Sequence, residues 1–193
     1  MTGVSRRAVL AGGAGAVLWV GAGRAEAARW TGRRSANGWP VLDEVPVHRI
    51  EGSDVDVPLR GGDVAAVLLH VARRFHYEID ALRAGEVVGH TRDREVAAPY
   101  ESNHLSGTAI AIRPRAYPVG VAGGLFPHEL AVVHAVVAEL DHAVAWGGDE
   151  GTPKEGHFHI AVPPNRLAAV AARVRAWDAA PGRGAGAVFA GPG

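Results

Sequence analysis

The chain has 193 residues, with 20 basic and 20 acidic side chains and no cysteine. Without cysteine it can form no disulfide, thiolate metal site or cysteine nucleophile, so histidines and carboxylates would have to hold any metal. The only lysine is Lys154, and no basic stripe of the kind that neutralises phosphates stands out, which makes nucleic acid an unsuitable partner. This length fits one domain with a single core.

The first 27 residues have the order of a twin-arginine export signal. Arg6 and Arg7 precede an apolar run, and Ala25-Glu26-Ala27 forms an A-x-A cleavage site. The run of about 13 apolar residues is shorter than the roughly 20 that span a bilayer. We therefore predict a signal peptide over residues 1–27 and a secreted or cell-wall-associated protein without a stable membrane span; an uncleaved anchor is the alternative.

The rest of the chain divides into three parts. Residues 28–38 are polar and aperiodic and read as a linker, residues 39–177 form the predicted domain, and residues 178–193 are predicted to be a disordered tail. An edge strand is expected within residues 41–50. From Asp63, a suitable N-cap, apolar residues recur at helical spacing on one face: Val64, Val67, Leu68, Val71 and Phe75.

The second half alternates short strands with helices. A helix is predicted from Pro127 to Leu140, and Asn165 is predicted to cap another over Arg166–Trp177. Four runs are typical of strands: Glu86–His90, Thr108–Ile112, His142–Trp146 and His157–Val162. We expect an α+β domain in which helices cover one face of a small, mostly antiparallel sheet.

Two motifs carry a family resemblance. Residues 102–111, Ser-Asn-His-Leu-Ser-Gly-Thr-Ala-Ile-Ala, resemble the S-x-H-x-x-G-x-A-x-D signature of VanY-like D-alanyl-D-alanine carboxypeptidases. Trp146-Gly147-Gly148-Asp149 and Glu155-Gly156-His157-Phe158 resemble that family's second motif. The resemblance implies the fold of zinc peptidoglycan peptidases, in which two histidines and an aspartate bind zinc. Such enzymes hydrolyse peptide bonds in peptidoglycan stems, so a stem peptide is the implied partner.

By that resemblance, His104 and His157 match the two histidine ligands. Catalytic zinc takes three protein ligands and leaves a position for a water molecule, which a nearby carboxylate deprotonates. Glu155 is the nearest acid to that general base, although the acid is expected three residues before the histidine, where this chain has Lys154. On a regular strand Glu155 and His157 would share a face, so the carboxylate could still reach the water.

The other matches are to groups that contact substrate. Arg92 and Arg94 precede the signature at a distance that suits the oxyanion-stabilising arginine, with solvated surface arginines as the alternative. Ser102 and Asp149 are candidate substrate-binding residues, and for Ser102 a turn-capping role is an equal alternative.

Ala111 occupies the place of the family's aspartate ligand, and a methyl group cannot bind zinc. Three hypotheses follow. His159 could substitute, because a strand places it on the same side as His157; Asp149 or another acid could move in; or the domain has lost tight zinc binding. The sequence thus predicts a secreted zinc peptidase acting on stem peptides, with an inactive relative that binds wall peptide or a partner as the alternative, and it leaves the oligomeric state open.

Overall fold

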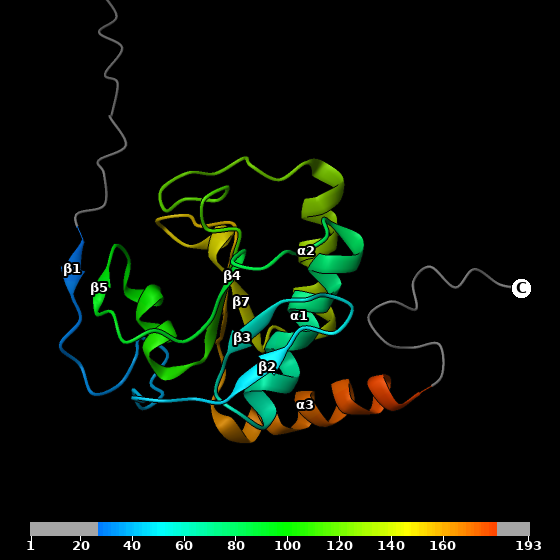
Figure 1. Ribbon diagram of the computed structural model, residues 1–193, viewed down its shortest axis with the longest axis horizontal. Helices are drawn as coiled ribbons and strands as arrows, with labels where there is room; N and C mark the ends of the chain where they lie inside the picture. The colour runs from blue at the N-terminus through cyan, green and yellow to red at the C-terminus, as the bar shows by residue number, and fades with distance from the viewer. Residues whose placement is uncertain (1–26, 181–193) are drawn as a thin grey trace, which may run out of the picture.

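The computed structural model describes residues 27–180 (Figure 1). The predicted signal, apart from its last residue, lies outside this range, as do residues 181–193 of the predicted tail. The helix that contains Trp177 runs on to Ala179, so the boundary predicted at residue 178 was placed too early.

A four-stranded sheet and three α-helices form the domain, which confirms the α+β prediction. The strands lie in the order β4 (Val87–Val88), β6 (Ala109–Ile112), β8 (His157–Ile160) and β7 (Val144–Trp146), and every pair is antiparallel. The helices are α1 (Asp63–Glu78), α2 (Pro127–Glu139) and α3 (Pro164–Ala179). Two small ribbons accompany them: β1 (Ala28–Arg29) with β5 (Glu95–Val96), and β2 (Val47–Arg49) with β3 (Asp56–Pro58).

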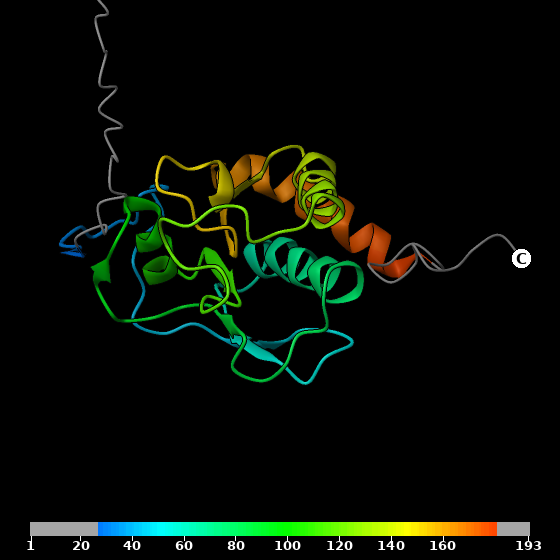
Figure 2. The ribbon, with the colours of Figure 1, turned by 90° about the horizontal axis from the view of Figure 1, so that it is seen from above.

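The sheet has one apolar face and one face that carries the histidines. Because side chains alternate along a strand, Ile110 and Phe158 point into the hydrophobic core formed with the helices. Ala111 and His157 lie on the opposite face, next to the 3-10 segment η1 (Pro99–Ser106). Figures 1 and 2 show η1 and helices α1–α3 on opposite sides of the sheet. The histidine face is therefore covered by the signature segment itself.

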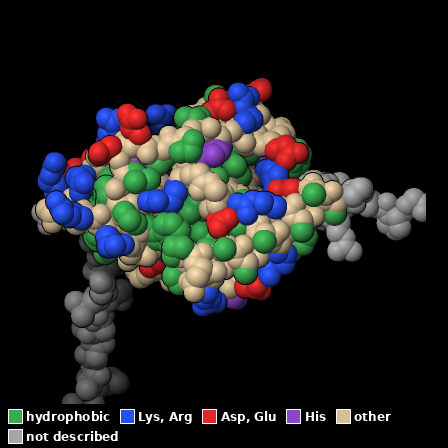
Figure 3. Space-filling model, turned by 90° about the horizontal axis from the view of Figure 1, so that it is seen from below, with side chains coloured by type: hydrophobic (Ala, Val, Ile, Leu, Met, Phe, Trp, Pro, Cys, Tyr) green, Lys and Arg blue, Asp and Glu red, His purple; other side chains and the backbone are tan. Residues whose placement is uncertain are grey.

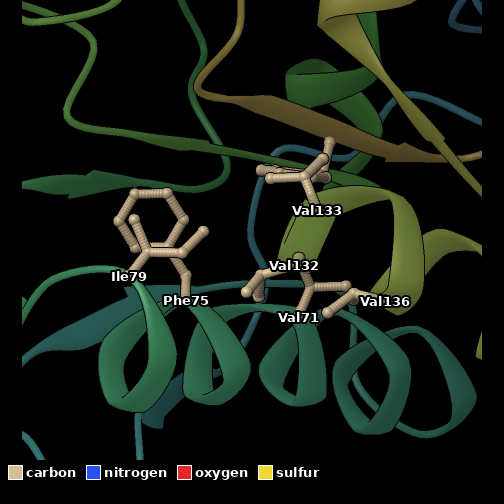
Figure 4. A pocket seen from close by; sticks show the side chains of 7 residues that line it. Val71, Phe75, Ile79, Val132, Val133 and Val136 are labelled. Atoms are coloured by element: carbon tan, nitrogen blue, oxygen red, sulfur yellow. The ribbon is translucent and has the colours of Figure 1, made fainter. Parts of the chain in front are cut away.

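Helices α1 and α2 pack over the sheet through branched apolar side chains. Figure 4 shows Val71 and Phe75 of α1 beside Val133 and Val136 of α2, and Phe158 lines the same space. The void between them is only about 10 Å³, which is too small for anything larger than one water molecule. This region is core packing rather than a ligand site.

Helix starts differ from the predictions by one or two residues. Gly62 rather than Asp63 is the N-cap of α1. Asp63 lies in the first turn instead, where its negative charge interacts favourably with the positive end of the helix dipole. Pro163 rather than Asn165 precedes α3, because Pro164 occupies the first helical position, for which its fixed φ is suited. The apolar face predicted for α1 is buried.

Residues 28–38 are not a loosely attached linker. Ala28 and Arg29 pair with Val96 and Glu95, and Ser35 is buried. The sequence of this arm has no apolar period, so it gave no sign that the arm binds the domain. The polar contacts that hold it are described below.

The outer surface carries charges of both signs. On the face drawn in Figure 3, acidic and basic side chains alternate with apolar ones. Among residues 27–180 there is no helix with the length and apolar character needed to cross a bilayer.

Candidate functional site: a buried histidine cluster

The signature segment forms η1 and the start of β6, and two glycines allow its close packing. Gly107 ends η1 in the left-handed region with φ of 67°, and a Cβ there would lie 2.8 Å from the backbone nitrogen of Arg60. Before β8, a Cβ on Gly156 would lie 2.0 Å from the carbonyl oxygen of Ile112. Glycine at position 107 therefore lets the end of η1 approach Arg60, and glycine at position 156 lets the start of β8 approach β6 beside His157.

Three imidazoles meet between η1 and β8. The ring of His157 lies 5.1 Å from that of His104 and 5.3 Å from that of His159, measured between centroids. Tyr100 packs beside them, 4.7 Å from His157 and stacked on His159 at 6.2 Å. The predicted convergence of His104 and His157 is present, with His159 as their neighbour.

All three imidazoles are held neutral at pH 7. Burial lowers the pKa of His104 to about 4, with the charge of Lys154 as the second cause. Burial also lowers the pKa of His159 to about 4. For His157, burial followed by the charges of His104, His159 and Lys154 lowers the pKa well below its usual range. Neutral imidazole is the form that binds metals.

The hydrogen bonds fix one tautomer and leave several nitrogens without partners. His104 Nδ1 lies 2.7 Å from the carbonyl oxygen of Gly89, so this nitrogen donates and Nε2 keeps its lone pair. His157 is fully buried, and neither of its ring nitrogens has a hydrogen-bond partner among the described residues. The same is true of His159 Nδ1. Such nitrogens cost free energy unless something binds them.

Ala111 lies directly across the β6–β8 ladder from His157, and Ala109 lies across from His159. Directly opposed residues of an antiparallel pair share a face, with Cβ atoms about 5 Å apart. Position 111 therefore faces the cluster, as the resemblance implies for the family's aspartate, but it supplies only a methyl group.

Glu155 is committed to another segment. One of its carboxylate oxygens accepts the N–H of Gly123 at 2.8 Å and the other accepts the N–H of Gly124 at 2.7 Å. The prediction that Glu155 shares a face with His157 assumed a regular strand, whereas β8 begins only at His157 and Glu155 lies in the preceding turn. Its carboxylate therefore anchors the loop before α2.

Lys154, in the position of the family's acid, forms a largely buried ion pair. Its ammonium nitrogen lies 2.6 Å from Glu101 Oε1, and the two side chains are 11% and 14% exposed. A positive charge thus stands where the resemblance implies a negative one.

The two candidate arginines bind backbone carbonyls of other segments. Arg92 donates to the carbonyl of Asp43 on the surface, and Arg94 donates to the carbonyls of Trp30 and Gly32. These contacts do not support an oxyanion role for either arginine. Asp149 is exposed in a short 3-10 turn, Gly147–Asp149.

Ser102 has a structural role instead of contacting substrate. It is fully buried, donates to the carbonyl of Pro99 and accepts the N–H of Ala36. This is close to the turn-capping alternative.

The N-terminal arm supplies polar residues that the sequence reading missed. Ser35 Oγ bonds Ser106 Oγ at 2.8 Å. The side chain of Asn37 donates to Thr108 Oγ1 and to the carbonyl of Ile160, both at 2.8 Å. Asn37 therefore joins the signature segment to β8, the strand of His157. No periodic signal marks such contacts, although Ser and Asn between glycines are usual in bonded turns.

The donor set fits zinc only in part. Neutral imidazoles are good zinc ligands, and the unpartnered nitrogens of His157 suit that role. However, within residues 27–180 no three histidine, aspartate or glutamate side chains lie so that they could hold one metal ion. Ala111 adds no donor, and Glu155 is bound elsewhere. The residues present thus offer imidazole donors but not the carboxylate ligand that the resemblance implies.

Comparison with known proteins adds no relative. No family model, curated protein or solved structure matches the chain.

Proposed function

We propose that this chain is an exported, cell-wall-associated domain that resembles the VanY-like zinc peptidases and binds wall peptide without hydrolysing it. Export rests on the twin-arginine signal, and the association with wall peptide rests on the resemblance carried by the two motifs around His104 and His157. This is the inactive relative that the alanine at position 111 suggests.

One observation supports the non-catalytic part of the proposal: none of the three positions matched to the family's carboxylates, 111, 154 and 155, offers a free carboxylate to the histidines. Position 111 is a methyl group opposite His157, and both oxygens of Glu155 are taken by backbone N–H groups. Position 154 carries an ammonium group that is paired with Glu101. The positions that the resemblance assigns to the carboxylate ligand and to the general base therefore offer neither. The carboxylate that does approach the cluster, Glu150, lies 4.0 Å from His159 Nε2 on the half-exposed side of the histidines.

The test combines binding and hydrolysis on the same substrate. Purified protein is mixed with isolated peptidoglycan and with a synthetic peptide that ends in D-Ala-D-Ala, with and without added zinc. We expect it to sediment with peptidoglycan and to release no D-alanine. Zinc-dependent release of D-alanine that disappears in His104→Ala would overturn the proposal, as would failure to bind peptidoglycan.

A second candidate is the zinc peptidase itself, with His159 as third ligand. It is favoured by the adjacent rings of His157 and His159 and by their unpartnered nitrogens. A catalytic zinc ion would supply an activated water molecule. Direct metal analysis separates the candidates. About one zinc per chain, lost in both His104→Ala and His159→Ala, supports this candidate, and protein that stays zinc-free in excess metal excludes it.

A further inference from the structure

The two chain segments that carry the paired histidines also carry a pair of opposite charges. Glu101 lies three residues before His104 in η1, and Lys154 lies three residues before His157 in the turn before β8. Their side chains meet, with Lys154 Nζ 2.6 Å from Glu101 Oε1. The contact joins residues 53 positions apart and is largely shielded from water.

Both partners are fixed by backbone hydrogen bonds. Glu101 Oε2 accepts the N–H of Ala97 at 2.7 Å. Lys154 donates its own N–H to Gly147 at 2.8 Å, and its carbonyl accepts the N–H of His157 at 2.9 Å. Burial is the largest single influence on Glu101 and would raise its pKa, but the hydrogen bond and charge of Lys154 together with the N–H of Ala97 outweigh it and lower the pKa, so the carboxylate is ionised.

We propose that the Lys154–Glu101 ion pair takes the place of a metal ion as the cross-link between the two histidine segments. A metal would join η1 to β8 by binding an imidazole from each. Here an ammonium group from one segment and a carboxylate from the other provide a comparable link with no external ion.

The same charges set what the cluster can bind. The ammonium of Lys154 belongs to the residue three positions before His157 and is bonded, largely buried, to the carboxylate three positions before His104, so its positive charge repels any divalent cation that approaches the two imidazoles. It also occupies the carboxylate of Glu101, three residues before His104. The cross-link therefore holds the histidines together and keeps metal away from them. This inference goes beyond the proposed function and stands whether or not the protein binds wall peptide.

The experiment compares Lys154→Met with Lys154→Arg in the full chain, using thermal unfolding with chelator or with added zinc, and zinc titration by calorimetry. Wild type should keep the same Tm in both conditions. Lys154→Met should lower Tm in chelator by roughly 10 °C, because it leaves Glu101 buried without its partner. Without the ammonium group, the free nitrogens of His104 and His157 should bind zinc at least about tenfold more tightly than in wild type, and zinc should restore part of the lost Tm. Lys154→Arg keeps the charge and should behave like wild type.

Neutralising both partners supplies a second variant if Lys154→Met does not fold. Glu101→Gln combined with Lys154→Gln leaves no unpaired charge, so it should unfold at a higher temperature than either single substitution. If the losses of Tm in Glu101→Gln and Lys154→Gln simply add up in the double variant, the two residues are not coupled and the cross-link is overturned. Zinc that binds wild type as tightly as Lys154→Met, or a wild-type Tm that falls on chelation, would overturn the exclusion of metal.

Discussion

Ala111 faces His157 across two hydrogen-bonded strands. A single substitution, of this alanine by aspartate, would therefore place a carboxylate beside the imidazoles of His104 and His157. The β6–β8 register fixes that relationship, because a slip of one residue would turn position 111 to the opposite, apolar face.

Restoring a carboxylate at position 111 should therefore increase metal affinity. We expect Ala111→Asp to bind zinc about tenfold more tightly than wild type, measured by calorimetry. Without metal the variant should lose about 1–3 kcal/mol of stability, because the new carboxylate is buried without partners. Ala109→Asp, opposite His159, is the matched control and should gain less. Equal gains in the two variants would show that position 111 has no special place beside His157.

The substitution Glu155→Gln tests whether the carboxylate of Glu155 anchors the loop before α2 or acts as a general base. Glutamine has one acceptor oxygen where glutamate has two, so the N–H of Gly123 or Gly124 should lose its partner. We expect a loss of about 1–3 kcal/mol in urea unfolding and faster amide exchange at these two glycines. Binding to peptidoglycan should not change. Unchanged amide exchange together with a loss of hydrolytic activity would instead support the general-base role.

Stability should fall as the solution becomes acidic between about pH 6.5 and pH 4. The unfolded chain protonates its histidines near pH 6.5, whereas burial lowers the pKa of His104 and His159 to about 4 in the folded state. The unfolded state thus binds more protons in this window, so the free energy of unfolding is greatest above pH 7 and decreases by roughly 3 kcal/mol for each histidine on approaching pH 4.

Thermal unfolding at a series of pH values measures this slope. His159→Gln should flatten it, whereas the control His128→Gln, at an exposed position in α2, should leave it unchanged. A stability that is flat from pH 7 to pH 4.5 would mean that the imidazoles protonate freely in the folded protein.

Asn37→Ala should destabilise the whole domain although residue 37 lies in the N-terminal arm. The substitution removes three hydrogen bonds of the side chain, one accepted from Ser35 and two donated to Thr108 and Ile160, and should cost about 1–3 kcal/mol in urea unfolding. Arg33→Ala, at an exposed position of the same arm, should change stability by less than about 0.5 kcal/mol. Similar effects of the two variants would show that the arm adds no specific anchor.

The sequence predicted the helices and the histidine pair well because both depend on local pattern. The apolar spacing from Val64 to Phe75 defines α1 directly, and the alternation around Ile110 and Phe158 places His157 on the face away from the core. What it missed depends on contacts between distant residues. The hydrogen bonds of Asn37 reach 71 and 123 residues along the chain, and the partner of Lys154 lies 53 residues away. No periodicity records such contacts.

The attachment of the arm bears on how a recombinant chain should be designed. A version that starts at Trp39, where the core pattern begins, would delete Ser35 and Asn37 and leave Ser102, Ser106 and Thr108 without their partners from the arm. One that starts at Ala28 keeps the pairing of β1 with β5. An affinity tag is therefore better fused after α3, at the C-terminal end, than in place of residues 28–38.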